Sequence, residues 1–183
     1  MGMRPLTPAA IACLFVSFGA GSLAAEAQTA LPPFKARALS GGHRTEQDLL
    51  GRPTVLVITP TKTAARACKV WGDELQEAMP PRVALRALLA MDIPFFVPDE
   101  FALRKAQEKV PARLWDHTWL LLHGNVEKKL GMPDDASEPY VFAFDADGRE
   151  VARDRGAVTA EKIRRIAAAL LGAQAETHRS AAR

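Results

Sequence analysis

Short apolar runs alternate with amphipathic stretches along the chain, and the two patterns predict strands and helices in turn. Residues 55–58 form a continuous run rich in β-branched side chains, which predicts a buried strand. From about residue 63 to 79, apolar residues recur at intervals of three and four, which predicts a helix with one face against a sheet. Pro80 and Pro81 should end this helix. Its apolar face comprises Ala64, Cys68, Trp71, Leu75 and Met79.

The same two periodicities predict the remaining elements. Further strands are expected at residues 34–39, 83–91, 119–122, 139–144 and 149–153. The alanines and leucines of residues 83–91 are also compatible with a helix. Further helices are expected at residues 46–50, 98–110, 125–130 and 159–171, with Thr45, Asn125 and Thr159 as N-caps and with Phe101, Leu103, Ala106 and Val110 on the apolar face of the second. This order, which ends in a hairpin and a helix, predicts an α/β sandwich with a mixed central sheet.

The first 27 residues differ in composition from the rest of the chain. A single arginine, Arg4, precedes an apolar run of small residues over 9–25, and Ala25 and Ala27 suit the two positions that signal peptidase reads. We therefore expect a cleaved signal peptide over residues 1–27 and export to a bacterial periplasm, with a retained membrane anchor as the alternative. Residues 28–33 are interpreted as a linker, 34–171 as one domain and 172–183 as a flexible tail.

Charge and histidine spacing exclude several function classes. The 24 Lys and Arg residues are interspersed with 21 Asp and Glu residues, so no clustered basic face for nucleic acid is expected. After signal cleavage no membrane span remains. His117 and His123 lie at the two ends of one predicted strand, about 20 Å apart, too far to bind one metal ion. Asp116 and His117 are candidates for a hydrogen-bonded pair, and neither a metal nor a cofactor is expected.

Cysteine usage limits thiol chemistry. The chain has two cysteines, and Cys13 lies in the predicted signal peptide, so Cys68 alone would remain and no internal disulfide can form. One interpretation makes Cys68 a reactive thiolate whose pKa is lowered by Arg66 and Lys69. The other makes it a small buried hydrophobe on the helix face of Trp71. The second interpretation is favoured, because Cys68 lies more than one turn beyond the helix N-terminus.

The arrangement of the predicted elements resembles the thioredoxin-like superfamily, in its redoxin branch, over residues 34–171. The resemblance rests on the order and spacing of four segments, at residues 45–53, 55–71, 125–132 and 138–148. It implies a three-layer sandwich, a Cys-x-x-Cys motif at the start of the helix and a cis-proline opposite the motif. Here Thr63 and Arg66 occupy the cysteine positions, and Pro139 occupies the proline position. The chain thus resembles periplasmic thioredoxin-fold proteins that lack the active-site cysteine pair.

Two segments are candidates for a binding groove. Thr61, Lys62 and Thr63 lead into the helix, where free backbone N–H groups favour an anion, unless a threonine simply caps the helix. In redox-active relatives the backbone before the cis-proline pairs with an extended peptide, so Glu138 and Pro139 suggest a peptide-binding edge, unless the proline is purely structural. The predicted groove comprises Thr61, Lys62, Thr63, Arg66, Glu138 and Pro139.

Three hypotheses for function follow. The first is an exported module without dithiol redox catalysis that binds an envelope protein or an extended peptide. The second is a one-cysteine peroxidase or redox sensor that uses Cys68. The third is a domain held within a larger envelope complex. The sequence favours a role without catalysis. If the protein is an enzyme, it is expected to be a thiol peroxidase or oxidoreductase.

Overall fold

The computed structural model describes residues 29–90, 96–123 and 126–181. The expected signal peptide and the expected cap Asn125 lie outside these residues. The strands are β1 (Lys35–Ala38), β2 (His43–Thr45), β3 (Thr54–Thr59), β4 (Ala84–Leu89), β5 (Thr118–His123), β6 (Tyr140–Phe144) and β7 (Glu150–Arg155). The helices are α1 (Ala65–Ala78), α2 (Asp99–Gln107), α3 (Val126–Lys129) and α4 (Ala160–Ala181), with two 3-10 helices, η1 (Glu46–Leu49) and η2 (Ala112–His117).

The strands form one mixed sheet in the order β2-β1-β5-β4-β3-β6-β7. The inner strand β3 runs parallel to β4 and antiparallel to β6, and β7 continues the sheet as the second strand of a hairpin. β4 is also parallel to β5, so the sheet contains both parallel and antiparallel pairs. The predicted α/β sandwich with a mixed central sheet is confirmed.

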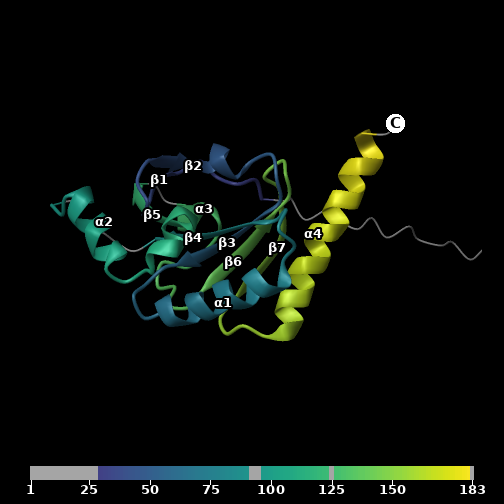
Figure 1. Ribbon diagram of the computed structural model, residues 1–183. Coiled ribbons are helices and arrows are strands. Elements are labelled where there is room, and N and C mark those ends of the chain that lie inside the picture. Colours follow the sequence, from purple (N-terminus) through teal and green to yellow (C-terminus); the bar gives the residue numbers. More distant parts are fainter. Residues whose placement is uncertain (1–28, 91–95, 124–125, 182–183) are drawn as a thin grey trace, which may run out of the picture.

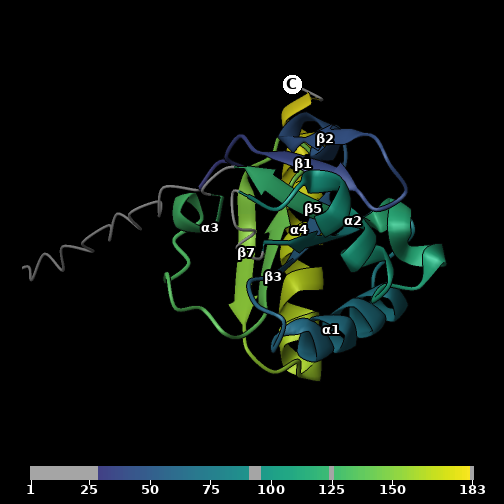
Figure 2. The same cartoon turned by 90° about the vertical axis from the view of Figure 1, so that its left-hand side faces the viewer.

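Helices cover both faces of this sheet. Successive side chains of a strand point to opposite faces, so each strand contributes to two separate cores. Val55 and Val57 of β3 pack with α1 and α4 on one face, whereas Leu56 and Ile58 pack on the other with residues 126–132 and the chain before β1. All six residues of β3 are therefore buried. Figure 1 shows α4 and α2 at opposite ends of the molecule, and Figure 2 shows α3 on the other side of the sheet from α1.

The predicted helix face at residues 63–79 is confirmed and the one at 98–110 is partly wrong. Cys68, Trp71 and Leu75 of α1 are buried. In α2, Leu103 is buried, whereas Phe101 is 45% exposed. Since α2 is a short helix at the end of the sheet, it buries only a narrow stripe.

Capping residues define the ends of several elements. The backbone N–H of Thr45 donates a 2.8 Å hydrogen bond to the carboxylate of Asp48, as expected for the turn that begins there. The hydroxyl of Thr159 accepts a hydrogen bond of 3.3 Å from the N–H of Lys162, so Thr159 caps α4 as predicted.

Three segments differ from the sequence-based expectation. Strand β2 was not predicted, and it exists because its backbone pairs with β1. The expected linker is packed, since the N–H of Leu31 donates a 2.8 Å hydrogen bond to the carbonyl of Gly148. The expected tail after Gly172 continues α4 to Ala181, and Figure 1 shows this end of α4 extending past the sheet. One glycine costs a helix only about 1 kcal/mol, and alanines follow it.

Candidate functional site

Thr63 and Arg66, which occupy the two cysteine positions implied by the resemblance, lie in the turn between β3 and α1 and in the first turn of α1. β3 ends at Thr59, and the turn places Lys62 and Thr63 at the surface, followed by the exposed Arg66 in the first turn of α1. The hydroxyl of Thr61 lies 2.8 Å from that of Thr63 and accepts a 3.3 Å hydrogen bond from the N–H of Ala64. Thr61 therefore stabilises the turn that precedes α1, whose N-cap residue is Ala64 and has no side-chain capping hydrogen bond, so neither threonine is the cap of the helix itself.

Cys68 lies inside the molecule and not at this turn. Its side chain packs with Val55, Val57 and Trp71, and the residue is 7% exposed. The thiol donates to the carbonyl oxygen of Ile58 at 3.7 Å. Burial raises the pKa of Cys68 to about 11, although a hydrogen bond with Thr59 acts in the opposite direction. A thiol with this pKa is almost entirely protonated at neutral pH. The low exposure confirms the interpretation of Cys68 as a buried side chain.

Pro139 lies at the same end of the sheet as the start of α1. Ile58 pairs with Tyr140, so Pro139, which immediately precedes β6, lies where β3 ends and the turn begins. Pro139 is buried and its carbonyl oxygen accepts a 2.9 Å hydrogen bond from the N–H of Gly156. The peptide bond before Pro139 is trans, since no cis peptide bond occurs among the described residues, so the cis-proline implied by the resemblance is not found here.

The two sides of the predicted groove share an end of the sheet without direct polar contact. Glu138 is half-buried and forms an ion pair of 3.6 Å with Arg155 of β7. No hydrogen bond or ion pair found in the described part of the chain joins Glu138 to Lys62, Thr63 or Arg66. A ligand seated between the two sides would therefore displace no existing ion pair between them.

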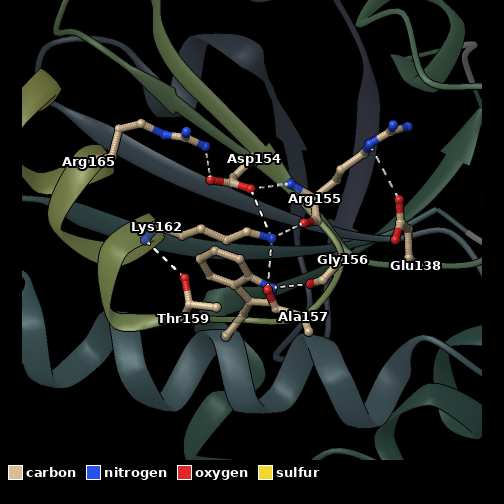
Figure 3. Close-up of polar contacts among 9 residues, drawn as sticks. Glu138, Asp154, Arg155, Gly156, Ala157, Thr159, Lys162 and Arg165 are labelled. Carbon is tan, nitrogen blue, oxygen red and sulfur yellow. Dashed lines mark hydrogen bonds and ion pairs between the residues drawn. The ribbon is translucent and has the colours of Figure 1, made fainter.

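Beside the ion pair of Glu138 and Arg155, further charged groups contact the loop that connects β7 to α4 (Figure 3). The Nζ of Lys162 donates to the carbonyl oxygens of Arg155 and Ala157 at 2.6 and 2.9 Å. The same ammonium lies 3.2 Å from the carboxylate of Asp154, which is 5% exposed and also pairs with Arg165. Sequence reasoning missed this cluster. Its one local signal is the alternation of charges along residues 153–155, which places Asp154 on the α4 face.

The contact of His117 differs from the one that the sequence suggested. His117 does not pair with Asp116; its Nδ1 lies 2.9 Å from Nη1 of Arg86, on β4. Nothing in the sequence places these two residues together, because the contact depends on η2 lying beside β4. No group of three metal-binding side chains occurs among the described residues, and the side chain of His123 lies outside them.

Comparison with known proteins gives matches in structure and none in sequence. No protein-family model and no curated protein matches the chain. Among solved structures, a candidate thiol:disulfide interchange protein DsbE from Chlorobium tepidum matches with a TM-score of 0.57 at 18% identity, over 78% of this chain and 96% of that one. The thioredoxin domain of a thiol-disulfide oxidoreductase from Bacteroides vulgatus matches at 0.53 and 14%, over 75% and 92%. A member of the Sco family of cytochrome c oxidase assembly proteins matches at 0.57 and 12%, over 79% and 95%.

The chain has a thioredoxin-like fold. At these identities the likeness concerns the fold, and activity has to be argued from the site. In this thioredoxin-like fold, the turn after β3 contains Thr63 and the first turn of α1 contains Arg66. None of the helices in the described residues is both long and apolar enough for a membrane span.

Proposed function

We propose that this thioredoxin-like protein is an exported binding or accessory module without dithiol redox catalysis. One observation carries the proposal: Thr63 and Arg66 stand at the entrance of α1, and the cysteine nearest to it, Cys68, is buried with a raised pKa. Disulfide exchange requires an attacking thiolate and a second sulfur to resolve the mixed disulfide. The side chains at the entrance of α1 supply neither.

The proposed binding surface is the groove between the α1 entrance and Pro139. Lys62, Thr63 and Arg66 are exposed on one side, and the partly exposed Glu138 precedes the buried proline on the other. An extended peptide bound between them would contact hydroxyl and cationic groups on one side and the backbone at the start of β6 on the other. The partner in this proposal is an extended peptide or an envelope protein.

Reduction of insulin disulfides tests the catalytic part of the proposal. The mature protein should give the background rate, because it has no exposed sulfur at α1. The matched variant carries Thr63→Cys and Arg66→Cys together with Cys68→Ala, which restores the spacing of a dithiol motif. Turnover by that double-cysteine variant would show that the scaffold and the assay are competent, whereas turnover by the wild-type protein would contradict the proposal.

Binding is tested separately by NMR titration with a set of extended peptides of differing charge. Amide shifts should concentrate at residues 61–66 and at Glu138. Arg66→Glu should weaken the binding of acidic peptides about tenfold, because it reverses one positive charge. Arg113→Glu, an exposed change on η2, is the matched control. Shifts spread over the whole surface, or an equal effect of both variants, would refute the groove.

Export is the remaining part of the proposal. Its support is the composition of residues 1–27, and two of the matching structures are described as an exposed lipoprotein and as a secreted disulfide oxidoreductase. Expression of the full chain in a Gram-negative host, followed by N-terminal sequencing of the periplasmic fraction, should give Gln28 as the first residue. A cytoplasmic product that begins at Met1 would contradict export.

The alternative one-cysteine peroxidase would require Cys68 to meet peroxide as a thiolate. Burial beneath α1 opposes both access and ionisation. Sulfenate formation on the folded protein would revive that alternative.

A further inference from the structure

Arg86 is a cation on the sheet face that lacks α1 and α4. It belongs to β4 and pairs in register with Leu56, so its side chain shares the face of Leu56 and Leu88. Its guanidinium carbon lies 5.7 Å from the centroid of the Trp119 ring. Stacking of this kind fixes the plane of the guanidinium group.

The polar contacts of Arg86 leave part of its guanidinium group unsatisfied. Nη1 donates to the carbonyl oxygen of Leu85 at 2.8 Å and to Nδ1 of His117 at 2.9 Å. Nε is buried and has no hydrogen-bond partner, the one such side-chain atom in the described part of the protein. A buried donor without an acceptor is costly, so an acceptor group placed beside Nε would stabilise this part of the protein.

Further positive charges lie near Arg86. The N–H of Ala84, at the start of β4, donates a 2.8 Å hydrogen bond to the carbonyl oxygen of Pro53, which places the neighbouring Arg52 at the same end of β4 as Arg86. Burial lowers the pKa of Arg86, and the nearby Arg52 and Arg44 lower it further, whereas Asp116 and Asp48 act in the opposite direction. Arg52 is exposed, and Arg44 is held loosely by Asp48 at 3.9 Å. Within the described residues, neither Arg86 nor Arg52 forms an ion pair with a carboxylate within 4 Å. The two carboxylates thus compensate the three guanidinium groups only in part.

His117 adds a neutral donor to this cluster. Because arginine remains protonated, Nη1 of Arg86 can only donate, so Nδ1 of His117 accepts and the ring proton lies on Nε2. Burial and the charge of Arg86 lower the pKa of His117, which keeps the ring neutral beside the guanidinium group.

We propose that Arg86, Arg52 and Arg44, with His117 beside them, form a binding site for an oxyanion, either a carboxylate or a phosphate. Guanidinium groups match both anions through paired N–H donors, and a bound anion would supply the negative charge that the cluster lacks. The cluster lies toward the N-terminal ends of β3 and β4, the opposite end of the sheet from the α1 entrance. It is thus independent of the peptide groove.

NMR titration of the full folded protein with sodium phosphate and, separately, with sodium acetate tests the proposal. Sodium chloride at matched ionic strength corrects for screening. The Arg86 Nε–H signal and the His117 ring signals should shift in a saturable manner with one or both anions. Saturation with phosphate alone or with acetate alone identifies the class of ligand.

Arg52→Gln is the decisive variant, because Arg52 is exposed and its replacement leaves the packing of Trp119 intact. It should weaken anion binding about tenfold, the loss expected for one charged hydrogen-bonding group. Arg82→Gln, an exposed change beside β4, should alter binding less than about twofold. No saturable shift with either anion, or equal binding by Arg52→Gln and the wild type, would overturn the proposal.

Discussion

The indole Nε1–H of Trp71 donates a 2.7 Å hydrogen bond to the carbonyl oxygen of Gly156, 85 residues further along the chain. The bond connects the buried face of α1 to the loop between β7 and α4. Lys162 of α4 completes the junction, because its ammonium lies 6.0 Å from the centroid of the Trp71 ring and donates to the carbonyls of Arg155 and Ala157. The two helices on this face of the sheet are therefore joined through one loop (Figure 3).

Lys162→Met should destabilise the protein by about 1–3 kcal/mol. Methionine preserves the apolar stem and removes the ammonium, so two carbonyl oxygens lose their donor and the buried Asp154 retains only Arg165 as an ion partner. Urea unfolding measured by tryptophan fluorescence gives the change in the free energy of unfolding.

Arg164→Met is the control for Lys162→Met, since Arg164 lies on the exposed face of the same helix. It should change the free energy of unfolding by less than about 0.5 kcal/mol. If the two variants are equally stable, Lys162 contributes nothing as a charged group and the junction depends on Trp71 alone.

Elements encoded by local patterns were predictable from the sequence. β3 is a continuous apolar run and α1 repeats apolar residues at three and four, so both could be placed without knowledge of their neighbours. β2 could not, because its residues His43, Arg44 and Thr45 have no apolar pattern. Its extended conformation is stabilised by backbone pairing with β1.

Features of the candidate site that depend on local sequence were likewise predictable, and contacts between separate elements were not. Burial of Cys68 followed from its position on one helix face with Trp71, and the absence of sulfur at Thr63 follows directly from the sequence. The contact of Arg86 with His117 was not predictable, because it joins residues on separate elements 31 positions apart. The suggested partner, Asp116, is adjacent to His117 in sequence and lies exposed.

The thiol of Cys68 should be almost unreactive in the folded protein. With a pKa of about 11, only about one molecule in a thousand is a thiolate at pH 8. A chromogenic disulfide reagent should therefore react at least about a hundredfold more slowly with the native protein than with the protein in urea. The native rate should follow the fraction of unfolded molecules.

Thr63→Cys combined with Cys68→Ala provides an exposed thiol at the start of the same helix for comparison. Its reaction should be rapid without urea, since Thr63 is exposed. Rapid reaction of the wild-type protein in its native state would show that Cys68 is accessible, and the role without catalysis would have to be reconsidered.

Two glycines should respond in opposite directions to alanine. Gly148 closes the β6–β7 hairpin with φ of 78°, and an added Cβ would lie 2.7 Å from Cδ2 of Leu50. Gly148→Ala should destabilise the protein by about 1–2 kcal/mol, mainly because the left-handed backbone disfavours a side chain. Gly72 lies within α1 with open space around it, so Gly72→Ala should stabilise the protein by about 1 kcal/mol. Thermal unfolding of both variants measures the difference, and a loss of stability in Gly72→Ala would contradict the expectation drawn from the open space around Gly72.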